Sequence, residues 1–120
     1  MRKLLITISI LFMCGSAWAD TASYYTRASC IAESGQCTMA NGKELMDNEM
    51  VAASWFYRLG TFLVVTNIDN GRSVKVQVTD RGPAKRLVKK GRIIDLSYAA
   101  MSKLGGISKG IINVKVERAK

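Results

Sequence analysis

The sequence of 120 residues contains no histidine, a single proline and only three cysteines. Without histidine, the Ser-His and Cys-His pairs that activate many enzymatic nucleophiles cannot form. Zinc sites draw chiefly on cysteine and histidine, so too few soft ligands remain for a site of that kind. We therefore expect neither a metal ion nor any other cofactor.

Long hydrophobic runs are also missing, and no segment reaches the roughly 20 apolar residues of a membrane-spanning helix. The apolar run at positions 4–13 follows two basic residues and precedes Ala17-Trp18-Ala19, which has the A-x-A form of a cleavage site. This layout predicts a secretory signal peptide over residues 1–19, removed after Ala19. A membrane anchor is the alternative, but the run is too short for one.

Cys14 raises a further alternative, the lipidated cysteine of a lipoprotein signal. The residues before it, Leu11-Phe12-Met13, have large side chains, whereas such a signal usually needs small ones. We therefore expect no lipid anchor at Cys14 and an exported protein, located in the periplasm, in the cell envelope or outside the cell. Residues 20–120 then form one domain, because this length supports one domain and not two.

Acidic residues are half as frequent as basic ones, with nine Asp and Glu against 18 Lys and Arg. Two basic residues leave with the signal peptide, so the mature charge is 16 minus 9, or +7. An exported basic protein rarely meets nucleic acid, so the expected partners are anionic envelope polymers such as peptidoglycan. The charge could equally serve only to keep the protein soluble.

Two cysteines, Cys30 and Cys37, remain after cleavage of the signal peptide. An even pair in an oxidising compartment predicts a disulfide. A bridge across so short a loop would stabilise the fold by roughly 2.5 kcal/mol in the chain-entropy model.

Short β-branched segments dominate the mature chain. Residues 62–68 and 73–79 read as strands joined by the hairpin turn Asn70-Gly71. Further strands are expected near residues 23–25 and over residues 92–96 and 111–118. The rest of residues 20–50 is expected to form a loop pinned by the disulfide. Ser97 can cap a helix that runs to Leu104. This pattern predicts a mainly β protein, a compact closed barrel without exposed strand edges.

The stretch VTDRGPAKRLVKKGRIIDLS, residues 78–97, is the candidate site because two aspartates enclose a basic run without acids. Asp80 follows the inward-facing valines of its strand at steps of two, which would place it as a general acid. The alternative is a turn aspartate next to Arg81-Gly82-Pro83. Asp95 lies between apolar residues in a strand and needs partners, either amides near the helix start or an arginine.

Two neighbouring groups of residues could bind a substrate. Aromatic rings at Trp55, Phe56 and Tyr57 suit the faces of sugars, although members of this triplet could instead fill the core. The basic run could form a rim that attracts an anionic polymer, or simply be a solvated loop. Its members are Arg81, Lys85, Arg86, Lys89, Lys90 and Arg92.

Residues 79–83, TDRGP, followed by residues 92–97, RIIDLS, resemble the signature of the rare lipoprotein A (RlpA) family. The segments Ala22-Ser23-Tyr24-Tyr25, Ala40-Asn41-Gly42 and Asn70-Gly71-Arg72 are also similar to family motifs. The resemblance covers nearly all of residues 20–120. It implies a six-stranded double-psi β-barrel with one or two short helices, related to expansin and barwin domains, and a monomer is expected.

The resemblance implies a lytic transglycosylase that cleaves peptidoglycan glycan strands between N-acetylmuramic acid and N-acetylglucosamine and leaves a 1,6-anhydro end. Asp80 matches the family's catalytic aspartate and is the expected general acid/base, with Asp95 supporting it. Trp55, Tyr57, Arg81 and Arg92 are the expected substrate-binding residues.

One position departs from the family pattern, because Ser54 stands where the family's T-A-A-H segment has histidine. Serine does not titrate near neutral pH but can hydrogen-bond a sugar hydroxyl, so Ser54 is expected to orient the substrate. The departure keeps an alternative open, a non-catalytic, expansin-like module that binds cell-wall polysaccharide. A barwin-like factor that binds a protein partner is a third hypothesis.

Overall fold

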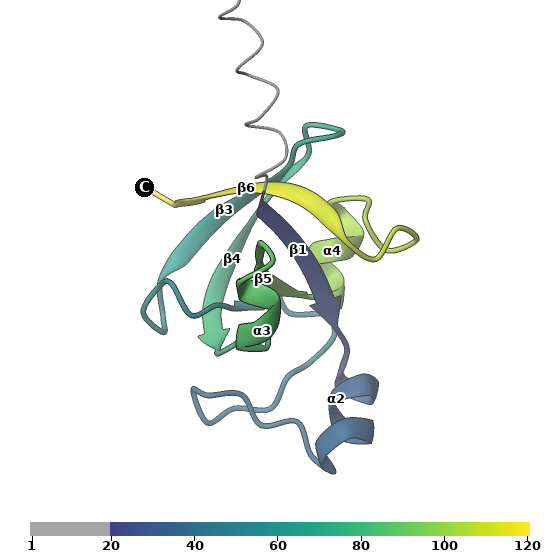
Figure 1. The fold of residues 1–120 in the computed structure, drawn as a ribbon. Helices are drawn as coiled ribbons and strands as arrows, with labels where there is room; N and C mark the ends of the chain where they lie inside the picture. Colours follow the sequence, from purple (N-terminus) through teal and green to yellow (C-terminus); the bar gives the residue numbers. More distant parts are fainter. Residues whose placement is uncertain (1–19) are drawn as a thin grey trace, which may run out of the picture.

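The computed structural model describes residues 20–120, so the predicted signal peptide and Cys14 lie outside the described residues. Six strands close into a barrel in the order β1-β5-β2-β4-β3-β6 (Figure 1). They are β1 Asp20–Tyr25, β2 Val51–Ala53, β3 Phe62–Asn67, β4 Ser73–Asp80, β5 Arg92–Ser97 and β6 Ile112–Arg118. Pairs β1–β5 and β2–β4 are parallel and the other pairs antiparallel. The predicted six-stranded barrel is confirmed.

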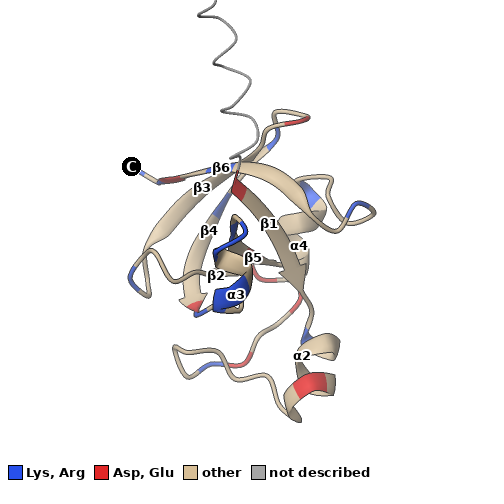
Figure 2. Ribbon diagram, viewed as in Figure 1, with Lys and Arg blue, Asp and Glu red and all other residues tan. Residues whose placement is uncertain are grey.

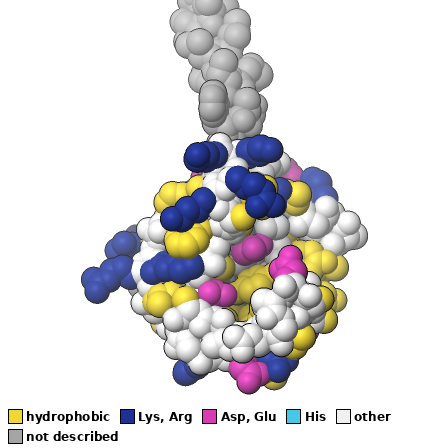
Figure 3. Space-filling view, turned by 60° about the horizontal axis from the view of Figure 1, so that its bottom comes forward, with side chains coloured by type: hydrophobic (Ala, Val, Ile, Leu, Met, Phe, Trp, Pro, Cys, Tyr) yellow, Lys and Arg dark blue, Asp and Glu magenta, His cyan; other side chains and the backbone are white. Residues whose placement is uncertain are grey.

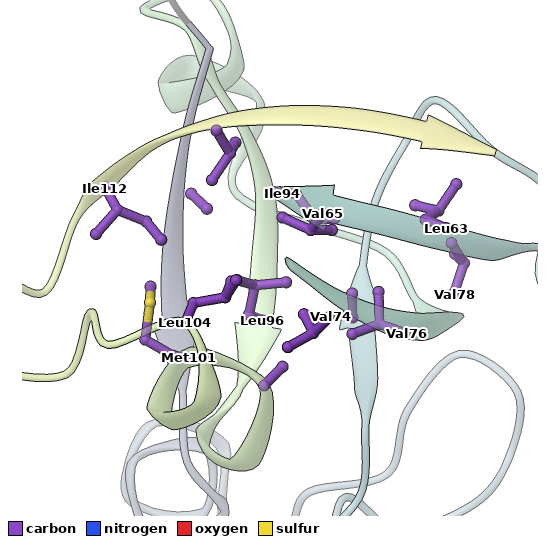
Figure 4. Close-up of a cluster of buried hydrophobic side chains, with 14 residues drawn as sticks. Leu63, Val65, Val74, Val76, Val78, Ile94, Leu96, Met101, Leu104 and Ile112 are labelled. Atoms are coloured by element: carbon purple, nitrogen blue, oxygen red, sulfur yellow. The ribbon is translucent and has the colours of Figure 1, made fainter. Parts of the chain in front are cut away.

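The barrel interior is filled by the alternating apolar residues of the strands (Figure 4). Val74, Val76 and Val78 of β4 face inward as predicted, and the charged and polar residues between them face out or stay half-buried. Helix α4, Tyr98–Lys103, contributes the buried Met101 to this core, and its C-cap Leu104 is buried there as well. The hairpin turn at Asn70-Gly71 is also confirmed, because β3 and β4 pair antiparallel around it.

Residues 20–120 contain three helices, α2 Arg27–Ser34, α3 Lys85–Val88 and α4 Tyr98–Lys103, where one or two were expected. Helix α4 starts as predicted, because the Oγ of Ser97 accepts a hydrogen bond from the Ala100 amide at 3.3 Å. Helix α2 replaces part of the expected loop. Thr26 caps it by accepting from the Ser29 amide at 3.0 Å. The helix buries no residue, so it lacks the apolar stripe that would have indicated it.

Residues 26–50, called here the α2 segment, lie beneath the barrel (Figure 1). The predicted disulfide between Cys30 and Cys37 is present and joins the end of α2 to the following loop. Arg27 forms an ion pair with Glu44 at 2.7 Å, which ties the start of α2 to the same loop. A second small core gathers here, formed by Cys37, Met39, Leu45 and Val51. The α2 segment is thus a stable part of the fold that packs against one end of the barrel.

A site with two carboxylates

The short strand β2 brings the two predicted aspartates together. Ala53 pairs with Asp80 on the parallel neighbour β4 and with Asp95 on the antiparallel neighbour β5. A shift of register between Ala52 and Ala53 places Asp80, rather than Thr79, opposite Ala53. Neighbouring strands lie about 4.8 Å apart, so the two aspartates sit on one face about 10 Å apart at Cα. Figure 3 shows acidic side chains at the edge of a hollow in the molecule, with most of the visible basic side chains above and to the left of it.

The carboxylate of Asp80 is fixed by three hydrogen bonds. Its Oδ1 accepts from the backbone amides of Ala40 at 2.9 Å and Arg81 at 2.8 Å. Its Oδ2 accepts from the hydroxyl of Tyr25 at 3.2 Å. The bond to Arg81 is the local turn contact that the sequence suggested, and the other two come from distant parts of the chain. Asp80 therefore ends its strand and also links the barrel to the α2 segment.

Asp95 has a sparser environment. Its Oδ1 accepts from the hydroxyl of Ser23 at 2.5 Å, and within residues 20–120 it forms no ion pair shorter than 4.0 Å. Burial raises the pKa of Asp95. The Ser23 hydrogen bond and the charge of Arg92 oppose this rise, while the nearby charge of Asp80 adds to it. Asp95 thus holds a proton more readily than an ordinary aspartate.

Asp95→Asn is expected to stabilise the protein at pH 7, because the folded state disfavours the ionised carboxylate. The pKa of Asp95 is higher in the folded than in the unfolded chain, so its stabilising effect is full below about pH 3.8. The stabilising contribution of protonated Asp95 is lost as the pH rises through its raised pKa in the folded state. Urea denaturation should show a gain of about 0.5–2 kcal/mol at pH 7, the usual size for relieving a costly functional group. The gain should shrink towards zero at pH 3.

Asp69→Asn provides the control for this measurement, because Asp69 is exposed on the β3–β4 turn and its only ion pair within residues 20–120 is with Lys109 at 3.3 Å. A surface pair of this kind contributes about 0–1 kcal/mol. A loss of stability in Asp95→Asn at pH 7 would contradict the assignment.

Two residues of β1 contact the aspartates, and sequence reasoning missed both as site residues. Ser23 and Tyr25 are two positions apart, so they share one face of the strand. Ser23 donates to Asp95 and Tyr25 to Asp80. Burial, the charge of Asp80 and its hydrogen bond all raise the pKa of Tyr25. The spacing in A-S-Y-Y was a usable signal, but only the pairing of β1 with β5 tells which face it lines.

Ser54 and Arg81 lie beside the site but use their polar groups locally. Ser54 is only 1% exposed, and its Oγ accepts from the amide of Phe56 at 3.0 Å. The guanidinium of Arg81 donates to the carbonyls of Ser54 and Tyr57, both at 2.7 Å. Together they hold the turn at residues 54–57 against the end of β4.

The aromatic triplet divides between two environments. Trp55 is 42% exposed, and its Nε1 donates to the carbonyl of Pro83 at 2.7 Å. The Nζ of Lys85 lies 4.7 Å from the centre of its indole ring, so Trp55 stands next to the TDRGP segment. Tyr57 instead packs on the barrel core. With Phe56 it lines a separate pocket of about 330 Å³, completed by Asp20, Ile93 and Val116.

The basic run mostly faces solvent on and after α3 (Figure 2). Lys85, Arg86, Lys89 and Lys90 are exposed, and within residues 20–120 none of them forms an ion pair. Arg92 is half-buried, and its Nε has no hydrogen-bond partner among the described residues. The four exposed basic side chains therefore have no carboxylate within ion-pair distance among residues 20–120.

Comparison with known proteins places this arrangement in a family, because a family model described as lytic transglycolase matches residues 18–116. The chain belongs to the lytic transglycolase family. Its fold is that of an RlpA-like double-psi β-barrel.

Two curated relatives of this lytic transglycolase domain carry informative names. A probable endolytic peptidoglycan transglycosylase RlpA of Aquifex aeolicus is 48% identical over 73 residues, which cover 61% of this chain and 30% of that protein. The endolytic peptidoglycan transglycosylase RlpA of Pseudomonas aeruginosa is 47% identical over 83 residues, covering 69% of this chain and 23% of that protein. This chain thus spans less than a third of the curated relatives it matches.

Solved structures of similar shape include the Streptomyces papain inhibitor, with a TM-score of 0.63 and 22% identity over 85% of this chain and 93% of that chain. This likeness concerns the fold. A mutant of the Clavibacter michiganensis expansin, in complex with cellohexaose, has a TM-score of 0.57 and 26% identity. That match covers 85% of this lytic transglycolase domain and 50% of the expansin chain.

Proposed function

We propose that this lytic transglycolase domain cleaves the glycan strands of peptidoglycan as a lytic transglycosylase. The observation that carries the proposal is the pairing of Asp80 and Asp95 across Ala53 on one face of the barrel. The names of the RlpA relatives, which are peptidoglycan transglycosylases, support the choice of substrate.

The reaction breaks the bond between C1 of N-acetylmuramic acid and O4 of N-acetylglucosamine. An acid gives a proton to the departing O4, and the C6 hydroxyl of the same muramoyl residue attacks C1. A base takes the proton of that hydroxyl, so the product is a 1,6-anhydro sugar and no water is consumed. One carboxyl can perform both transfers in turn, or two can share them.

The environments of the two aspartates favour a division of labour, where the sequence suggested that Asp80 does both. We assign the proton donor to Asp95, because burial raises its pKa and its only hydrogen bond within residues 20–120 falls on Oδ1. Asp80 accepts three hydrogen bonds, as suits a carboxylate that takes up the hydroxyl proton. When two paired carboxyl groups have different environments, one usually acts as the acid and the other as the base. Exchange with solvent then restores both groups.

Substrate binding is assigned to the rim of the same face. Trp55 offers an exposed ring for a sugar, held in place by Pro83 and Lys85. The basic residues on and after α3, which form no ion pair within residues 20–120, attract an anionic strand and raise the association rate, an effect that salt weakens. Ser54 and Arg81 act here by shaping the turn that carries Trp55. Tyr57 and Arg92 remain predicted contacts of a glycan strand that extends beyond Trp55.

We place this activity in the cell envelope, reached by export with a signal peptide over residues 1–19. The Cys30–Cys37 disulfide fits an oxidising compartment. No helix among residues 20–120 has the length and apolar character needed to cross a membrane.

Digestion of peptidoglycan glycan strands stripped of their stem peptides tests the function. The expected products, seen by mass spectrometry, end in 1,6-anhydro-N-acetylmuramic acid. Products heavier by one water would indicate a hydrolase and contradict the proposal. The same masses also exclude a contaminating hydrolase, because its products would carry one extra water.

A binding module without catalysis is the second candidate, favoured by Ser54 at the family's histidine position and by the expansin structure that holds cellohexaose. In that case the wild-type protein would sediment with purified sacculi at low salt and release no product. The Asp80→Ala variant would bind the sacculi as well as the wild type. Product release that depends on Asp80 would exclude this candidate.

A further inference from the structure

The side chain of Tyr25 is the least expected member of the site. Its hydroxyl donates to Oδ2 of Asp80 at 3.2 Å, although the two residues are 55 positions apart. The ring packs against the small core of the α2 segment, next to Cys37, Met39 and Leu45. On its other side, the backbone of Tyr25 pairs with Ser97 of β5. Tyr25 is thus held between the barrel and the α2 segment.

Asp80 depends on such support because it is the last residue of β4. Beyond it the chain turns away through Gly82 and Pro83, so no following strand residue restrains its side chain. One oxygen is held by the amides of Ala40 and Arg81. The only restraint on the other oxygen, within residues 20–120, is the hydroxyl of Tyr25.

We propose that Tyr25 is a positioning residue, which holds Oδ2 of Asp80 in the orientation needed to take the proton of the muramoyl hydroxyl. The inference rests on the proposed transglycosylase function. Tyr25 acts through Asp80 and transfers no proton itself. Its hydroxyl stays a donor throughout the physiological range, because burial and Asp80 raise the pKa of Tyr25. A purely structural tyrosine would contribute its ring to the packing and leave the rate unchanged when the hydroxyl is removed.

Tyr25→Phe tests this proposal, since it removes the hydroxyl and keeps the ring. The neighbouring Tyr24→Phe is the matched control, because Tyr24 packs edge-on against Tyr98 with ring centres 6.1 Å apart. We expect kcat on stripped glycan strands to fall about tenfold or more in Tyr25→Phe, the factor set by one hydrogen bond to a charged group. KM should stay within about twofold, since the substrate contacts are unchanged. Tyr24→Phe should keep both values.

A spectroscopic measurement tests the contact without relying on catalysis. In protein labelled at the tyrosine Cζ carbon, the NMR signal lost in Tyr25→Phe identifies Tyr25. That signal should remain at its neutral position at pH values where an ordinary tyrosine, with a pKa of about 10, ionises. In Asp80→Asn it should move towards tyrosinate at a lower pH than in the wild type, because the charge of Asp80 and one acceptor are gone, while burial, the largest cause of the raised pKa, still keeps that pKa above the ordinary value.

The outcomes separate the inference from the function on which it rests. If Asp80→Asn leaves the Tyr25 titration unchanged, the contact is absent in solution and the inference fails. If Tyr25→Phe keeps the wild-type kcat while Asp80→Asn is inactive, the inference fails and the function stands. If the wild type itself releases no anhydro product, the proposed function fails, and the positioning role fails with it even when the titration shows the contact.

Discussion

Asp80→Asn is expected to slow the release of anhydro products by about 10²–10⁴-fold, the usual loss when a general acid or base is removed. Asparagine has nearly the same shape and cannot take up the hydroxyl proton. Its side-chain oxygen can still accept from the amides of Ala40 and Arg81, which lie 2.9 and 2.8 Å from Oδ1 in the wild type. The end of β4 should therefore stay in place. Product release is followed by chromatography with mass detection.

The control for this change is again Asp69→Asn, in the β3–β4 turn that precedes the start of β4, whereas Asp80 is the last residue of that strand. It removes the same charge from the protein, so it reports any effect of net charge on the association with anionic strands. We expect its rate to equal that of the wild type within about twofold, since exposed substitutions far from a site are near neutral. If Asp80→Asn kept a comparable rate, Asp80 would have no part in the chemistry.

The second large effect concerns the packing beneath the site. Leu96 is fully buried in β5, between Asp95 and the helix cap Ser97, and pairs with Ala52. Leu96→Ala should lower the free energy of unfolding by about 2–5 kcal/mol, because it removes apolar contacts and leaves a cavity in the core. Urea denaturation followed by tryptophan fluorescence measures the loss. Activity should fall with it, because the strand that carries Asp95 loses its anchor.

Ile111→Ala distinguishes core packing from a general effect of losing an aliphatic side chain. Ile111 is 44% exposed just before β6. An exposed substitution of this kind usually changes stability by no more than about 0.5 kcal/mol. A similar loss for Leu96→Ala and Ile111→Ala would contradict the assignment of Leu96 to the core.

Local patterns in the sequence were sufficient to predict most of the barrel. The alternation of Val74, Val76 and Val78 depends only on which face of a strand is buried. The turn at Asn70-Gly71 and the cap at Ser97 depend on the conformational needs of a few neighbouring residues. Helix α2 was not predicted because it buries no apolar stripe. Its capping box also has Ser29 at the third helical position, where a glutamate would have been recognised.

The site was predictable only in part, because it is defined by strand register. The sequence pointed to Asp80 and Asp95 through the resemblance, but their common face follows from the pairing of both with Ala53. Register between strands distant in sequence has no local signature, so the contacts of Ser23 and Tyr25 could not be foreseen. The contacts of Ser54 are likewise set by the turn that follows it, which its expected match to the histidine of the family's T-A-A-H segment does not reveal.

The hydrogen bonds of the two aspartates also say when the site can exist during folding. Apart from the bond to Arg81, they join residues separated by 40, 55 and 72 positions. Each of these contacts requires a long stretch of chain to close into a loop before it is gained. A partly folded chain therefore carries two aspartates but no paired carboxylates. The proposed activity therefore requires that the barrel and the α2 segment have met.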